Sequence, residues 1–189
     1  MRLFIASPLT NEVEEMLGKA IFVLKQKRTR VNWVAPKNIH LTLKFLGDTD
    51  EAQVAEIISS LESIAGRHRA VNSMIDRLGA FPNIRRPRVI WAGLSGGIEQ
   101  LEALAGEIEE AMAAFGFPKE NRPFKSHLTL GRVKDNFQTA ELAEAVNSYQ
   151  FVPEKIVFSE MVLFKSTLTP RGPIYERLST WKLMVSNRE

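Results

Sequence analysis

Short apolar runs and longer amphipathic stretches follow one another twice along the chain. Residues 2–9 and 88–95 each open on an arginine and continue as a mostly apolar run, which predicts two strands. Each run precedes a segment with apolar residues three or four positions apart, which predicts a helix. The first helix, which Thr10 can cap, has apolar residues at Val13, Met16, Leu17, Ala20, Ile21 and Leu24. The second, which ends near Gly116, has Ile98, Leu101, Leu104, Ala105, Ile108, Ala111 and Met112.

The next predicted strand of each half carries the same tetrapeptide, His-Leu-Thr-Leu, at His40–Leu43 and again at His127–Leu130. Side chains alternate between the two faces of a strand, so the histidine and threonine of each copy share one face. The leucines take the other face and are expected to point toward a core. The chain has only three histidines, so two of them occupy identical local settings.

A second helix is predicted after each motif strand, at about 51–64 and 139–147. A further strand closes each half, at about 73–78 and 155–164. Nearly the same offset separates the opening strands and the two motif histidines. The sequence therefore predicts one bilobal domain over 1–189, with repeat halves at about 1–87 and 88–189. Residues 180–189 are expected to form a fraying end.

This repeated plan predicts two similar lobes of helix and strand, related by a pseudo-twofold axis. If the motif strands face one another across that axis, both His/Thr pairs line a single central cleft. Sequence alone does not determine strand order, so two stacked lobes with unrelated surfaces are the alternative.

Composition limits the chemistry that the chain can use. Its 189 residues, 44% of them hydrophobic and 25% charged, are typical of a globular protein. Because there is no cysteine, thiolate metal sites and a thiol nucleophile are excluded, and a cytoplasmic location is expected. No signal peptide or membrane span is expected. The net charge of +3 permits a polyanionic partner, and Arg122, Lys125 and Arg132 flank the second motif.

Two histidines on matching strand faces favour acid–base catalysis. An unperturbed imidazole titrates at about pH 6.5, so one member of a pair can be neutral while the other is protonated. One can take a proton from a nucleophile while the other donates a proton to a leaving oxygen, which suits in-line displacement at phosphorus. Thr42 and Thr129 can donate hydrogen bonds to a phosphate, and Arg132 can stabilise the charge of its transition state. Neither a metal nor a cofactor is expected.

Other catalytic designs fit the sequence less well. Zinc usually has three or four protein ligands, whereas each tetrapeptide supplies one histidine and no carboxylate. The sequence has no Gly-x-Ser-x-Gly motif, and the glycine-rich segment 93–97 lacks the lysine of a phosphate-binding loop. His68 lies in the polar run 66–69 and is expected to be a surface residue.

Strict alternation does not identify the cation that contacts the phosphate or the aromatic residue that stacks on a base. It places Arg132 on the leucine face, so Arg132 reaches the phosphate only if the strand bulges, which Gly131 would allow. It places Lys44 on the histidine face, as an alternative cation. Four aromatic residues lie near the motifs, namely Trp33, Phe45, Phe124 and Tyr175. Core packing is expected for most of them, and a base could stack on one.

The paired His-x-Thr-x motifs resemble those of the two-histidine (2H) phosphoesterase superfamily, and the flanking blocks resemble its RNA 2′,3′-cyclic phosphodiesterase branch. The resemblance extends over nearly the whole chain, through residues 2–6, 38–47, 87–93, 124–132, 163–168 and 172–175. It implies the α+β class, with two pseudo-twofold-related lobes around a central cleft. Each lobe would be a mainly antiparallel sheet with helices on its outer face.

The resemblance also implies an activity and residue roles. The substrate would be an RNA 3′ end or a nucleotide bearing a 2′,3′-cyclic phosphate, and the product a 2′-phosphomonoester. His40 would be the proton donor and His127 the proton acceptor, with Thr42, Thr129 and Arg132 holding the phosphate. Phe45, Phe124 and Tyr175 are the candidates for base stacking. The residues alone do not distinguish the acid from the base, because the two motifs are locally alike.

Several functional alternatives remain at this point. Some members of the family join RNA ends through 2′–5′ linkages, which implies a secondary ligase activity. The chain could instead hydrolyse another small cyclic phosphate, or bind RNA or nucleotides without turnover. A monomer is expected.

Overall fold

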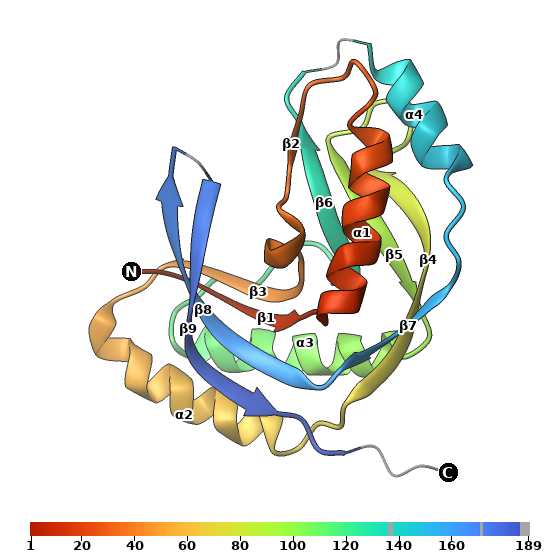
Figure 1. Cartoon of the computed structure of the whole chain (residues 1–189). Helices are drawn as coiled ribbons and strands as arrows, with labels where there is room; N and C mark the ends of the chain where they lie inside the picture. The colour runs from red at the N-terminus through yellow and green to blue at the C-terminus, as the bar shows by residue number, and fades with distance from the viewer. Residues whose placement is uncertain (136–137, 171, 186–189) are drawn as a thin grey trace.

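The computed structural model describes residues 1–135, 138–170 and 172–185 (Figure 1). Its strands are β1 (Arg2–Pro8), β2 (Val31–Trp33), β3 (His40–Asp48), β4 (Val71–Phe81), β5 (Val89–Ser95), β6 (His127–Val133), β7 (Glu154–Phe158), β8 (Glu160–Thr169) and β9 (Gly172–Lys182). Its helices are α1 (Asn11–Leu24), α2 (Val54–Ala65), α3 (Ile98–Ala114) and α4 (Thr139–Ser148), with 3₁₀ turns η1 (Pro36–Asn38) and η2 (Glu51–Gln53).

The element predictions hold except toward the C-terminus and in the loop before the first motif. The strand expected at 155–164 is two strands, β7 and β8, separated at Ser159. The short strand β2 was not predicted. The predicted fraying end is wrong for 180–182, which belong to β9, and residues 186–189 lie outside the described part. β9 escaped prediction because it is an edge strand with many exposed polar residues, which obscure the alternation of a half-buried strand.

The strands form one sheet in the order β7-β4-β5-β6-β3-β1-β8-β9, with β2 paired to β6. All pairs between these strands are antiparallel. The strand that closes the first half, β4, pairs with β5 of the second half, and β8 of the second half pairs with β1 of the first. Each lobe of the sheet therefore contains strands from both sequence halves.

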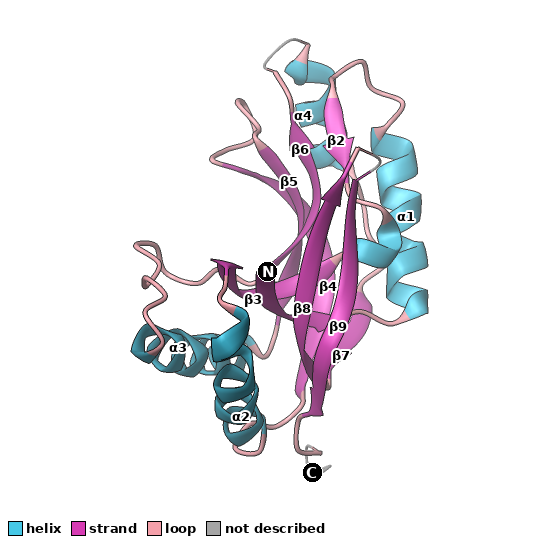
Figure 2. Cartoon of the chain, turned by 90° about the vertical axis from the view of Figure 1, so that its left-hand side faces the viewer, coloured by secondary structure: helices cyan, strands magenta, loops and turns pink. Residues whose placement is uncertain are grey.

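The helices are exchanged between the halves in the same way. α1 contacts α4, and α2 contacts α3, so each helix pair combines one helix from each half. Figure 2 shows α1 with α4, and α2 with α3, as two separate groups against the strands. Buried residues of all four helices belong to one core cluster, which also contains Leu41 and Leu128. The predicted α+β class with an antiparallel sheet is confirmed.

The motif leucines and the motif histidines thus lie on opposite faces of the sheet. The face that carries the leucines is covered by the helices. The other face, here called the helix-free face, has its own small apolar cluster of Phe4, Ala6, Val162 and Phe164, with Tyr175 packed against it. No helix in the described part of the chain combines the length and apolarity needed to cross a membrane.

A β-bulge in β3 corrects the predicted position of Lys44. Thr42 pairs with Ala6 and Lys44 with Ile5, so Leu43 is an extra residue without a partner in β1. The extra residue reverses the alternation beyond it. The Lys44 side chain consequently lies on the helix-covered face, where it is only 1% exposed and its Nζ donates to Glu109 Oε1 (2.8 Å) and to the Pro118 carbonyl (3.0 Å). Lys44 is therefore a structural residue and not a cation of the histidine face.

We predict that Lys44→Ala lowers the free energy of unfolding by about 3 kcal/mol, the lower end of the range for removing one partner of a buried ion pair. The lower end applies because the Glu109 side chain keeps 20% of its surface exposed. Lys19→Ala, at an exposed position of α1, should change it by less than about 0.5 kcal/mol. Urea unfolding measures both, and equal effects would contradict the structural role of Lys44.

Candidate active site

The two motif strands lie side by side in the sheet. β3 lies between β1 and β6, and β6 lies between β5 and β3. Leu41 pairs with Leu128, so His40 and His127 each precede the paired residue on their own strand. In a regular antiparallel ladder, such diagonal neighbours have Cα atoms about 7–8 Å apart and their side chains on one face. Both histidines therefore project from the helix-free face at the junction of the two lobes.

A second bulge, in β6, places Arg132 on the same face. Trp91 pairs with Thr129 and Ile90 with Gly131, so Leu130 is the extra residue. Leu130 and Gly131 are both buried, whereas Arg132 is exposed. The bulge that the sequence required for Arg132 is thus present. Because β3 bulges at the equivalent leucine, Phe45 occupies the position in the first copy that Arg132 occupies in the second.

Each histidine ring is held by the same backbone contact. The Nδ1 of His40 lies 2.8 Å from the Asn38 carbonyl oxygen, and the Nδ1 of His127 lies 2.7 Å from the Lys125 carbonyl oxygen. A carbonyl can only accept, so Nδ1 carries the hydrogen in both rings. Nε2 is then the nitrogen that titrates, and it has no hydrogen-bond partner in the described part of the chain. Two imidazoles with free Nε2 atoms on one face can give and take protons.

Aromatic rings surround both histidines. The His40 ring lies 4.9 Å from the ring of Phe4, centroid to centroid, and 5.6 Å from that of Tyr175, with the Tyr175 ring edge-on. The His127 ring lies 5.1 Å from the ring of Phe81, also edge-on. These rings shield the imidazoles from water and fix their orientation. Partial burial of this kind favours the neutral form of a histidine.

Burial lowers the pKa of His40 below its usual value, although the hydrogen bond to Asn38 opposes that shift. Burial also lowers the pKa of His127, where the bond to Lys125 opposes it and the positive charge of Arg132 adds to it. Arg132 exerts the same electrostatic effect on the pKa of Tyr175, which burial raises overall. The positive charge of Arg132 therefore affects the pKa of side chains on both sides of the lobe junction. It also makes the two histidines differ, because it lowers the pKa of His127 and not that of His40.

The remaining predicted phosphate ligands are available. Thr42 and Thr129 share the histidine face, and their hydroxyls have no partner within the described residues. No carboxylate pairs with Arg132 in that same part of the chain. The described residues also contain no group of three or more His, Asp or Glu side chains that could hold a metal ion. The face thus presents two hydroxyls, two imidazoles and one guanidinium without a carboxylate competing for them.

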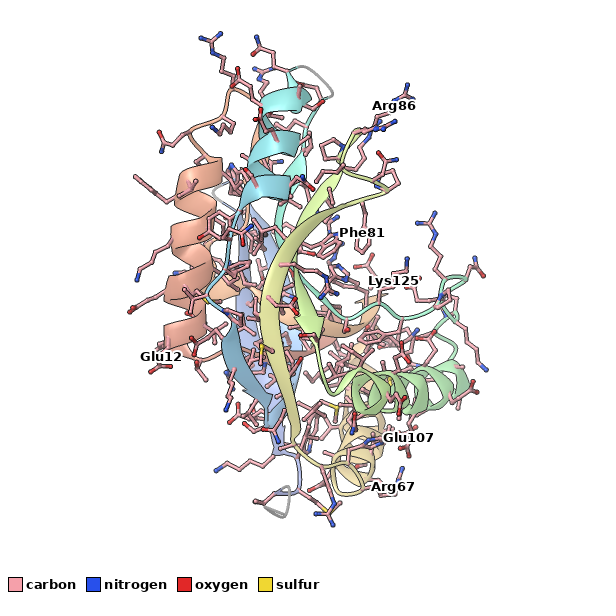
Figure 3. The ribbon with its side chains drawn as sticks, turned by 90° about the vertical axis from the view of Figure 1, so that its right-hand side faces the viewer. Glu12, Arg67, Phe81, Arg86, Glu107 and Lys125 are labelled. Carbon is pink, nitrogen blue, oxygen red and sulfur yellow. The ribbon has the colours of Figure 1, made fainter. Side chains whose placement is uncertain are left out.

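His68, the third histidine, lies outside this site. It lies at the surface but is partly buried, with 18% of its side chain exposed, and its Nε2 lies 2.6 Å from Glu107 Oε2. Figure 3 shows Glu107 and Arg67 toward the lower end of the molecule, below Phe81 and Lys125, which lie near its middle. A pocket of about 430 Å³ next to His68 contains none of the predicted site residues.

The aromatic candidates divide into three kinds of position. Phe45 is 55% exposed beside Phe4 on the helix-free face, which leaves a ring face open to a base. Tyr175 packs edge-on against His40, and Phe124 lines a pocket with His127. Trp33 lies over Gly131, where a Cβ would come within 2.8 Å of the indole, and packs against the main core. Trp33 is therefore structural.

Sequence reasoning did not assign a role to three residues that contact or flank the histidines. Phe4 and Phe81 pack on the histidine rings, and Trp91 lies opposite Thr129 in the neighbouring strand. A signal for Trp91 was present, because Gly79 and Gly93 leave room for its indole; a Cβ on Gly79 would approach it to 2.2 Å. That signal becomes readable only once the strand pairing is known.

Comparisons with known proteins agree with this geometry. The family model described as LigT like Phosphoesterase matches twice, over residues 10–91 and 94–175. An RNA 2′,3′-cyclic phosphodiesterase from Aquifex aeolicus is 36% identical over 175 residues, which cover 91% of this chain and 90% of the relative. A crystal structure of a Thermus thermophilus protein has a TM-score of 0.80 and 27% identity over 99% of this chain and all of that one. Escherichia coli LigT complexed with 3′-AMP has a TM-score of 0.69 and 28% identity, covering 96% and 97% of the two chains.

A sheet that brings two His-x-Thr strands together, with each copy matched by the same family model, defines a two-histidine phosphoesterase. The chain belongs to the LigT-like phosphoesterase family. Each of the two matched segments contains one copy of the His-Leu-Thr-Leu tetrapeptide.

We predict that both site histidines titrate below the usual range of the imidazole, because burial lowers each pKa. Protonating a buried ring is unfavourable, so the folded protein loses stability as the pH falls from about 6.5 through the lowered values. Arg132→Gln should raise the pKa of His127 and leave that of His40 closer to its original value, because Arg132 acts on His127. NMR titration of the ring resonances measures this, and an equal change at both histidines would contradict it.

Proposed function

We propose that this protein hydrolyses the 2′,3′-cyclic phosphate at RNA 3′ ends, or on nucleotides, to a 2′-phosphomonoester. The observation that carries the proposal is the matched pair of imidazoles, each with Nδ1 bonded to a carbonyl and Nε2 free on one face. The names of relatives such as the Aquifex aeolicus and Methanocaldococcus jannaschii proteins support this substrate class. The 3′-AMP bound to Escherichia coli LigT supports a nucleotide at the site.

In the proposed reaction, His127 is the base and His40 is the acid. The cation of Arg132 favours the neutral form of His127, which is the form that accepts a proton from water. His40 is not subject to this effect, and the negative charge of a bound phosphate raises the pKa of a neighbouring imidazole. His40 can then donate its Nε2 proton to the leaving 3′ oxygen. The structure thus offers an electrostatic reason for roles that the two identical tetrapeptides cannot distinguish.

Thr42, Thr129 and Arg132 are proposed to hold the phosphate and to stabilise the charge that develops on its oxygens. Phe45, with its open ring face, is the preferred stacking surface for the base of the nucleoside that carries the cyclic phosphate. The imidazolium, the two hydroxyls and the guanidinium supply the electrophilic assistance, so we propose a reaction that needs no metal. We further propose that the protein acts as a monomer in the cytoplasm.

We predict that His40→Ala and His127→Ala each lower kcat/KM for 2′,3′-cyclic AMP by about 10²–10⁴-fold, the usual contribution of a general acid or base. His68→Ala, which alters the histidine outside the candidate site, should retain the activity of the unaltered protein. EDTA should have no effect on any of the rates. Full activity of both site variants, when folded, would overturn the proposed function.

A substrate with a better leaving group separates the two roles. The leaving phenolate of a nucleoside 2′-(p-nitrophenyl phosphate) needs little protonation, so His40→Ala should lose much less activity on it than on the cyclic phosphate. His127→Ala should lose activity on both substrates, because both reactions need an activated water. The reverse pattern would exchange the assigned roles of the two histidines.

A further inference from the structure

Three stretches of the sequence contain no acidic residue, and the fold brings them together. No Asp or Glu occurs in residues 16–47, 77–98 or 121–134, although these stretches hold most of the chain's 25 lysines and arginines. The first stretch contains β2, the second contains β5, and the third contains β6. Because β6 pairs with both β2 and β5, the three stretches meet in one part of the sheet.

A row of paired residues shows which face of the sheet these cations occupy. Asn32 of β2 pairs with Arg132 of β6. Arg132 also pairs with Val89 of β5, which in turn pairs with Phe81 of β4. Directly paired residues have their side chains on one face, so the row lies on the helix-free face. The Phe81 ring contacts the His127 ring, with centroids 5.1 Å apart, so the row borders the candidate site.

Two more cations lie one step beyond this row, further from His127. The backbone N–H of Lys134 donates to the Arg30 carbonyl (2.9 Å), so the pairing of β2 with β6 continues past Asn32 and Arg132. Side chains alternate along a strand, so Arg30 and Lys134 share the face of Arg132, and both are exposed. Two residues of a strand span about 7 Å. These cations are therefore neighbours of Arg132 on the side away from the histidine.

The loop between β4 and β5 adds two arginines at the same end. The side-chain Oδ1 of Asn83 accepts hydrogen bonds from the backbone N–H groups of Arg85 and Arg86 (3.1 Å each). These bonds hold the loop backbone, and both arginines are exposed. Figure 3 shows Arg86 toward the upper end of the molecule, above Phe81 and Lys125. We define the basic band as the four residues Arg30, Arg85, Arg86 and Lys134.

The charges of the basic band are largely free of carboxylate partners. Within the described residues, Arg85, Arg86 and Lys134 form no ion pair. Arg30 lies 3.7 Å from Asp135, but the Arg30 side chain is 76% exposed, and exposed pairs of this kind are weak. The basic band therefore keeps its positive charge available for an anionic partner.

Two cations elsewhere on the helix-free face are in a different situation. Arg77, which lines the pocket beside His127, donates to Asp76 Oδ1 (2.8 Å). Arg177, which stands over the Phe164 ring, donates to Glu160 Oε2 (3.1 Å). A polyanion that extends from the site is thus attracted toward the basic band rather than toward either of these pairs.

We propose that the basic band binds the sugar–phosphate backbone of the RNA that precedes the cyclic phosphate. The inference rests on the proposed function, and it narrows the substrate class from nucleotides to RNA ends several nucleotides long. The reacting phosphate is held by the histidines, the threonines and Arg132, so a mononucleotide does not extend to the basic band. Each further nucleotide of an RNA adds a negative charge, and lysine and arginine side chains bind such charges with release of counterions. The basic band thus lowers KM for RNA without taking part in the chemical step.

The test compares 2′,3′-cyclic AMP with a hexa-adenylate that ends in a 2′,3′-cyclic phosphate. We expect kcat/KM at low salt to be higher for the hexa-adenylate by about tenfold or more, and this advantage to shrink as NaCl is added. Each phosphate contact on a single strand contributes about −0.7 to the slope of log affinity against log salt concentration. If the hexa-adenylate has no advantage, or its advantage does not depend on salt, the basic band proposal is wrong and the proposed function stands. If neither substrate is hydrolysed, the proposed function itself fails.

Charge reversal locates the effect. Arg86→Glu combined with Lys134→Glu should remove most of the advantage of the hexa-adenylate. The same variant should keep kcat/KM for 2′,3′-cyclic AMP, which also shows that it is folded. Lys19→Glu combined with Lys155→Glu makes the same change of net charge at exposed positions outside the basic band, and should keep the advantage because distant exposed charges are screened. An unchanged advantage in the first variant, an equal loss on both of its substrates, or the same loss of advantage in the second variant would overturn the proposal.

Discussion

The pairing of Leu41 in β3 with Leu128 in β6 is the contact on which the rest of the arrangement depends. It is the single registered pair between the two motif strands in the described part of the chain, and it joins the two groups of strands into one sheet. A shift of this pairing by one residue would turn one histidine toward the helix-covered core. The main core cluster opposes such a shift, because it buries both paired leucine side chains completely. Packing of the apolar face thus determines where the imidazoles lie.

Exchange of strands and helices makes this junction rigid. β4 of the first half pairs with β5 of the second, β8 of the second half pairs with β1 of the first, and each helix pair contains one member from either half. The halves cannot separate without breaking strand pairs and dividing one continuous core. The same design permits asymmetry at equivalent positions. The two bulges place Phe45 of β3 and Arg132 of β6 on the helix-free face, at equivalent positions of the repeat. The repeated fold therefore presents an aromatic ring on the strand of His40 and a cation on the strand of His127.

The sequence correctly predicted the parts of the site that depend on local periodicity. It did not predict the parts that depend on pairing between strands far apart in the chain. Alternation of period two assigned His40 and Thr42 to one face correctly up to the bulge. It misplaced Lys44, because the extra residue at Leu43 exists only with respect to the pairing with β1. The pairing of β4 and β8 with strands of the other half could not be predicted either, because strand order depends on contacts between distant parts of the chain.

The central claim is that one phosphate is held between two imidazoles that face each other across the lobe junction. The crystal structure of this protein with bound 2′-AMP would test it most directly. The account predicts that Nε2 of His40 and Nε2 of His127 each lie about 2.6–3.2 Å from an oxygen of the same phosphate. Thr42 and Thr129 should donate hydrogen bonds to that phosphate as well. A phosphate that contacts only one histidine, or that binds away from both, would contradict the account.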